Sequence, residues 1–168
     1  MEDPRVIDQT EPLRIRKQAV AVELALPGSP PRTVEVFLAE HRPNEFRRQH
    51  VLDLLEHVQA FLPARDVATG TREIFNQDTV LWIGVPPSPF GSEPDGADEE
   101  LFEFRKPVRV DLMGAGPLSG ELLYSAPQES TRSVDYLNAA GRFLRLWSKE
   151  RLYLINKAFV LRVVESGP

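Results

Sequence analysis

The chain has 168 residues, of which 42% are hydrophobic and 27% are charged, and it contains no cysteine. This composition is typical of a soluble globular protein, and the lack of cysteine excludes disulfides, thiolate nucleophiles and cysteine-bound zinc. No apolar run reaches the roughly 18 residues that a membrane-spanning helix needs, and the acidic N-terminus lacks the apolar core of a signal peptide. We therefore predict a cytoplasmic protein that does not insert into a membrane.

The first half of the chain has the pattern of a small antiparallel sheet. Residues 1–11 are polar and aperiodic, which predicts a flexible tail. Apolar residues alternate with polar or small ones over residues 13–26 and again over residues 33–40, which predicts two strands. Apolar residues then recur at spacings of three and four from Val51 to Val58 and predict a short helix, in which Asp53 caps or braces the helix. Three more strands are predicted at residues 61–65, 71–75 and 80–85.

The second half repeats this order after an acidic linker. The linker, residues 86–100, is rich in Pro, Gly and acidic residues, and we expect it to be extended and mobile. Strands are predicted at residues 102–113, 119–125, 143–147, 151–156 and 159–164, with a short helix N-capped by Ser133. Gly114, Gly116 and the Ser119-Gly120 pair are interpreted as turn residues.

The two halves also align with each other. Residues 131–164 match residues 49–83, with Asp135 on Asp53, Phe143 on Phe61 and Asn156 on Asn76. Such a repeat indicates that one structural unit is used twice. Five short antiparallel strands usually close into a barrel, because closure hides the edges of the sheet. We therefore predict a mainly β protein with two tandem five-stranded small β-barrels, each with one short helix, at residues 12–85 and 101–166.

The second copy resembles the small barrels called Sm-like, and in particular a group of bacterial small-barrel domains. The resemblance covers residues 105–165 and is carried by Ser-Gly-Glu-Leu at 119–122, Thr-Arg-Ser-Val-Asp-Tyr-Leu-Asn at 131–138, Phe143-Leu144, and Leu-Ile-Asn-Lys at 154–157. It implies the fold and a bacterial origin, and it carries no known activity. The first copy departs from the pattern at His50 and Glu56, where the second has Arg132 and Asn138.

Basic side chains of the second copy are the candidate binding residues: Arg105, Arg109, Arg132, Arg142 and Arg145. The first two resemble the arginine pair of PilZ cyclic-dinucleotide receptors, and paired guanidiniums can clamp phosphates. The companion motif is absent, because the chain runs DLMGAG after position 110, with Met113 where a serine belongs. The later arginines alternate with aromatic residues, as in single-strand binders, but those aromatics occupy core positions and the isoelectric point is near 5.3.

Other chemistry has weaker support. On a helix, His50, Asp53 and His57 would share one face and could hold a metal, but the second copy has no histidine at these positions. The sequence lacks G-x-S-x-G, H-E-x-x-H and P-loop motifs, so we expect no enzyme, no cofactor and no metal.

Two functional hypotheses remain open. The first is a non-catalytic protein-interaction or scaffolding module that binds a protein partner through a barrel edge or the basic face of the second copy, and that could also form a homo-oligomer through barrel edges. The alternative is nucleotide or RNA binding through the same arginines.

Overall fold

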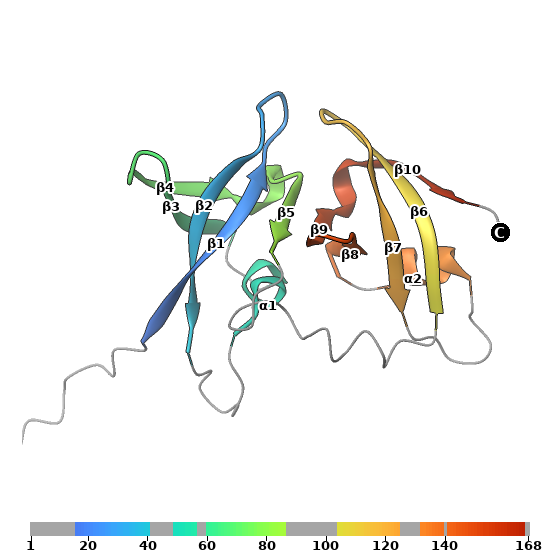
Figure 1. The fold of residues 1–168 in the computed structure, drawn as a ribbon, viewed down its shortest axis with the longest axis horizontal. Coiled ribbons are helices and arrows are strands. Elements are labelled where there is room, and N and C mark those ends of the chain that lie inside the picture. The colour runs from blue at the N-terminus through green and yellow to red at the C-terminus, as the bar shows by residue number, and fades with distance from the viewer. Residues whose placement is uncertain are drawn as a thin grey trace, which may run out of the picture.

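The computed structural model describes residues 16–40, 49–56, 60–86, 104–124, 132–139 and 141–166, and it is mainly β (Figure 1). Ten strands form one antiparallel sheet, and the only α-helices among these residues are two short ones. The first-half elements are β1 (Lys17–Ala25), β2 (Arg32–Ala39), α1 (Val51–Glu56), β3 (Phe61–Asp66), β4 (Arg72–Asn76), the 3-10 turn η1 (Gln77–Thr79) and β5 (Trp82–Val85). The second-half elements are β6 (Phe104–Leu112), β7 (Leu118–Tyr124), α2 (Ser133–Asn138), β8 (Phe143–Trp147), β9 (Leu152–Asn156), the 3-10 turn η3 (Lys157–Phe159) and β10 (Val160–Glu165).

Strand order is the same in the two halves. The sheet runs β10-β6-β7-β8-β9-β5-β1-β2-β3-β4, so the order β10-β6-β7-β8-β9 of the second half repeats the order β5-β1-β2-β3-β4 of the first. The pairing register agrees as well: Phe61 pairs with Asn76, and their aligned residues Phe143 and Asn156 pair with each other. The two halves meet where β5 pairs with β9.

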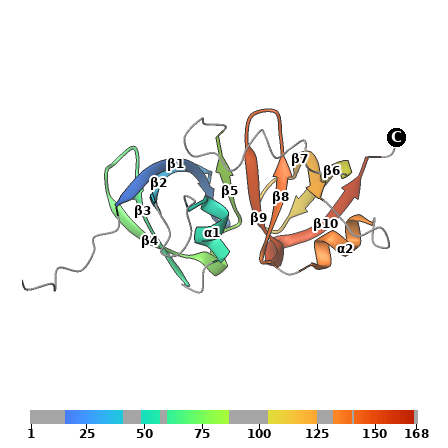
Figure 2. The same ribbon diagram turned by 90° about the horizontal axis from the view of Figure 1, so that it is seen from below.

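The prediction of two closed barrels is wrong. Each half curls, as Figure 2 shows from below, but the sheet is continuous and open. Closing the first half would require β4 to pair with β5. Instead, β5 has β1 on one side and β9 from the other half on the opposite side. Two of the four edges that closure would have paired within the halves, those of β5 and β9, are therefore paired with each other.

We call the pairing of β5 with β9 the joint between the halves. The hydrophobic core on each side of this joint includes residues of the other half. The first core consists mostly of first-half residues but includes Phe143, Leu152 and Leu154 from the second half. The second core includes Ala25, Leu81 and Trp82 from the first half. The halves therefore share their interiors, although a linker separates them in the sequence. The predicted tail (1–11) and all of the predicted linker except its first residue lie outside the described residues.

The two helices begin differently. The carboxylate of Asp53 accepts a hydrogen bond of 3.0 Å from the backbone N–H of His50, so the prediction that Asp53 caps or braces α1 is confirmed. The prediction that Ser133 is the N-cap of α2 is wrong. Arg132 occupies the N-cap position, and Ser133 is the first helical residue, with a buried hydroxyl that has no hydrogen-bond partner among the described residues. Among those residues, neither helix has the length and apolar character needed to cross a membrane.

Gly120 lies within β7 and not in the predicted turn, because β8 passes very close to it. A β-carbon at this position would overlap the backbone carbonyl of Trp147.

We expect Gly120→Ala to lower the free energy of unfolding by about 1–3 kcal/mol, the usual cost of overpacking. Chemical denaturation measures the change. Gly116→Ala is the matched control, since a β-carbon at Gly116 meets nothing within 4 Å. Equal effects of the two substitutions would contradict the close approach of β7 and β8.

Candidate interaction sites

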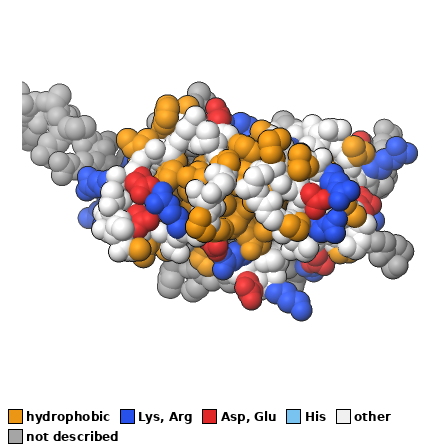
Figure 3. All heavy atoms as spheres, turned by 90° about the horizontal axis from the view of Figure 1, so that it is seen from above, with side chains coloured by type: hydrophobic (Ala, Val, Ile, Leu, Met, Phe, Trp, Pro, Cys, Tyr) orange, Lys and Arg blue, Asp and Glu red, His pale blue; other side chains and the backbone are white. Residues whose placement is uncertain are grey.

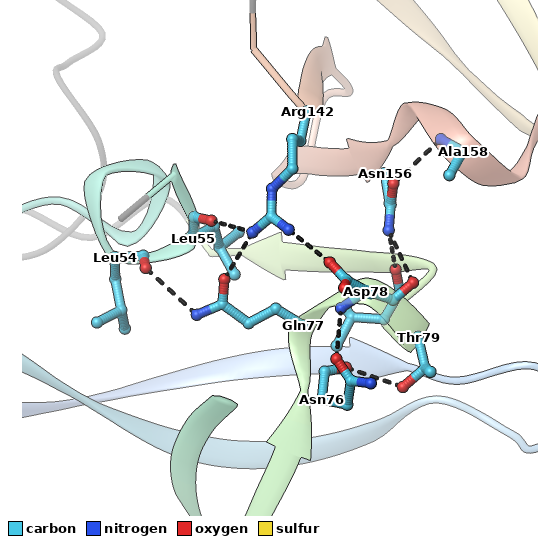
Figure 4. A network of polar contacts seen from close by, with 10 residues as sticks. Leu54, Leu55, Asn76, Gln77, Asp78, Thr79, Arg142, Asn156 and Ala158 are labelled. Atoms are coloured by element: carbon cyan, nitrogen blue, oxygen red, sulfur yellow. Dashed lines mark hydrogen bonds and ion pairs between the residues drawn. The ribbon is translucent and has the colours of Figure 1, made fainter. Parts of the chain in front are cut away.

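Arg142 joins the two halves by a network of polar contacts (Figure 4). It immediately precedes β8, and its guanidinium donates to the backbone carbonyl of Leu55 at 2.9 Å and to Oε1 of Gln77 at 2.9 Å. A third contact, of 2.5 Å, reaches the carboxylate of Asp78. Gln77 is almost fully buried, so Arg142 supplies a hydrogen bond that water cannot replace. This arginine therefore has a structural role at the joint.

Two asparagines occupy the same place in the two halves. Oδ1 of Asn76 accepts from the backbone N–H of Asp78, and Oδ1 of Asn156 accepts from that of Ala158, so each asparagine caps a 3-10 turn. The amide group of Asn156 also donates to the carbonyl of Val80 at 3.1 Å and to that of Asp78 at 3.4 Å. The hydrogen bonds of Asn156 therefore connect the end of β9 to the turn before β5.

The five predicted binding arginines lie in separate places. Arg105 and Arg109 are both on β6, where they form ion pairs with Glu121 (3.0 Å) and Asp111 (3.1 Å). Arg132 is exposed at the start of α2, and Arg145 is half-buried on β8. Their contacts among the described residues do not place them around one ligand position, and Arg142 is bound to residues of the first half.

A cleft lies beside Arg105. It has a volume of about 610 Å³ and is formed by β6, β7 and the turn after β8. Its basic groups are Arg105 and Lys149, its acidic group is Glu121, and Trp147 forms part of its wall. The indole N–H of Trp147 is buried and has no hydrogen-bond partner among the described residues. Arg105 forms its ion pair with Glu121 within this cleft, so an anionic group bound there would compete with that carboxylate.

The residues that were considered for a metal site and rejected, His50, Asp53 and His57, are only partly described. His57 lies outside the described residues, and the residues that are described contain no group of three metal-ligating side chains. The carboxylate of Asp53 accepts a hydrogen bond from the backbone N–H of His50 at the start of α1.

The two outer strands of the sheet carry exposed apolar side chains. In the described sheet, β4 pairs only with β3, and β10 pairs only with β6. Ile74 on β4 is 73% exposed, Phe61 on the neighbouring strand β3 is 57% exposed, and Leu161 on β10 is 61% exposed. Large apolar residues at an unpaired edge favour pairing with a strand of another chain.

Charged groups accompany both edges. Near β10, Asp111 is in contact with Arg109 and Arg162, and the hydrogen bond from Arg162 lowers the pKa of Asp111 below its usual value. Next to β4, Arg32 contacts Glu73 and Asp66. Charged pairs beside an edge strand oppose indiscriminate pairing of the edges. Figure 3, seen from above, shows apolar side chains in the middle of that face and opposite charges toward both ends.

These features define a mainly β protein with an open, curled sheet, whose two outer strands each have one unpaired edge among the described residues. Comparison with known proteins gives no closer assignment, because no family model, curated protein or solved structure matches the chain. Sequence reasoning proposed binding at strand edges in general but did not identify Ile74 or Leu161. The alignment of the halves sets Ile74 against Leu154 and Leu161 against Leu81, but only the structure shows that Leu154 and Leu81 are buried.

Proposed function

We propose that the protein is a non-catalytic interaction or scaffolding module of the bacterial cytoplasm, built from two copies of an Sm-like five-stranded unit. The repeated strand order and register support the duplication. The observation that carries the proposal is the exposure of Ile74 and Leu161 on strands whose outer edges are unpaired among the described residues.

Binding at these edges uses the backbone itself. An added strand forms hydrogen bonds with the free N–H and C=O groups of β4 or β10, and its alternate side chains pack on the exposed apolar residues. The backbone supplies affinity, and the neighbouring ion pairs exclude strands with unsuitable charges.

The test is recovery of protein partners with variants at the edges. We expect Ile74→Lys together with Leu161→Lys to reduce recovery of bound protein at least tenfold, since a lysine at an edge disfavours pairing. Val134→Lys is the control, because Val134 is an exposed apolar residue on α2 and lies on neither edge strand. Recovery that is unchanged by the edge variants would remove the proposal.

A second candidate function is nucleotide or RNA binding, and the cleft beside Arg105 favours it. Arg105 and Lys149 could contact phosphate, and Trp147 lies in the same wall. For this function, binding of a labelled RNA or cyclic dinucleotide should weaken with salt and be lost in Arg105→Ala, but persist in Lys17→Ala. Arg142→Ala is unsuitable as a test, because that residue holds the joint together.

A further inference from the structure

We infer that the partner of these edges is a second copy of this chain, with β4 of one copy paired to β10 of the next. This inference rests on the proposed function and deepens it by naming the partner. The chain already contains one contact of this kind. In the second half β9 has the place that β4 has in the first half, and in the first half β5 has the place that β10 has in the second. Within the chain, β9 pairs with β5.

The internal joint predicts the register of the external one. Ile83 on β5 pairs with Leu154 on β9. Val163 has the place of Ile83 in the second half, since Val163 pairs with Val110 on β6 as Ile83 pairs with Leu24 on β1. Applied to the free edges, the same pairing sets Val163 of one copy opposite Ile74 of the next.

Burial at the internal joint accounts for the exposed residues at the edges. Leu154, Phe143 and Leu81 are all buried there. Their equivalents at the free edges are the three exposed residues Ile74, Phe61 and Leu161. A second copy would therefore cover the apolar side chains that the sheet leaves exposed.

The charges agree with this register. Val85 pairs with Leu152 at the internal joint. The equivalent pair between copies is Glu165 with Arg72, and opposite charges directly across two strands are favourable.

The turn next to β4 also supports the pairing. Asn156 donates to the carbonyls of Asp78 and Val80 across the internal joint. Asn76 caps its own turn with the same geometry. Between two copies, its amide group would face the carbonyls of Ala158 and Val160.

The contact between copies has fewer polar contacts than the internal joint. Arg142 has its equivalent in Ala60, and Gln77 in Lys157, so the buried arginine contact is not repeated. We expect a weaker contact, with assembly that depends on protein concentration. Because the two edges differ, the contact is head-to-tail and produces either a ring or a filament.

The first experiment measures mass by light scattering or analytical ultracentrifugation as the concentration rises. Wild-type protein should assemble, whereas a variant with one edge blocked should stay monomeric, because the contact joins two different edges and each copy must supply one of them. For this reason the decisive variants block one edge completely, by Ile74→Lys with Phe61→Lys on the β4 side and by Leu161→Lys with Val164→Lys on the β10 side, all four of which are exposed.

Each fully blocked variant has only one kind of working edge and should be monomeric alone, and an equimolar mixture of the two should form a heterodimer. The heterodimer would also show that both variants are folded. A blocked variant that still assembles alone would indicate an edge pairing with itself and would overturn the inference. A mixture that stays monomeric would overturn it as well.

The second experiment measures register by disulfide formation, which has no background because the chain lacks cysteine. Ile74→Cys in one copy and Val163→Cys in another should cross-link on mild oxidation, since residues opposite each other in a sheet have suitable geometry. Val67→Cys with Val163→Cys is the control and should remain unlinked. Wild-type protein that is monomeric at all concentrations, yet loses a different protein partner when the edges are blocked, would overturn this inference and leave the proposed function standing. If the wild-type protein is monomeric and the blocked variants keep every protein partner, both the inference and the proposed function are contradicted.

Discussion

Replacement of Leu154 by alanine is expected to lower the free energy of unfolding by about 2–5 kcal/mol, the usual cost of a large cavity in a core. Leu154 is fully buried, and although it belongs to the second half, it packs in the core of the first. The substitution should therefore weaken both halves, and denaturation should remain a single transition. Thermal and chemical unfolding, followed at more than one wavelength, measure these effects.

Ile74→Ala is the matched control for this prediction. Ile74 has the same place on β4 as Leu154 has on β9, but it is largely exposed in the single chain. At a concentration where the protein is monomeric, its replacement should change stability by no more than about 0.5 kcal/mol. Two separate transitions, with only one affected by Leu154→Ala, would show that the halves do not share their cores.

The elements of this fold could be predicted because their side chains alternate so regularly. Val34, Val36 and Leu38 face the core on β2 while the residues between them do not, and this pattern defines a strand without knowledge of its neighbours. The pairing of Phe61 with Asn76 and of Phe143 with Asn156 likewise agrees with the alignment of the halves.

The neighbours of each strand could not be predicted in the same way. All four residues of β5 are buried, and their apolar pattern does not say whether β4 or β9 lies beside the strand. The closed barrels were predicted from the general tendency of short strands to hide their edges, and the chain hides one pair of edges by joining its halves instead. Gly120 was misread for a related reason, since only the close passage of β8 requires a glycine there.

The candidate site was predicted less well than the fold. An arginine in a sequence can serve a ligand or a buried acceptor, and the sequence does not distinguish these roles. Arg142 has its acceptors, Leu55 and Gln77, far away in the chain, so its structural role depends on a joint that the sequence did not reveal.

Arg142→Ala is expected to lower the free energy of unfolding by about 1–3 kcal/mol, because it leaves the buried oxygen of Gln77 and the carbonyl of Leu55 without their donor. Chemical denaturation measures the loss. Asp78→Ala is the control, since Asp78 is 66% exposed and an ion pair at the surface contributes only about 0–1 kcal/mol. The reason for the difference is burial, since water can replace Arg142 at Asp78 but not at Gln77. If the two substitutions cost the same, or if Arg142→Ala leaves stability unchanged, then the arginine does not hold the halves together and is available for a ligand.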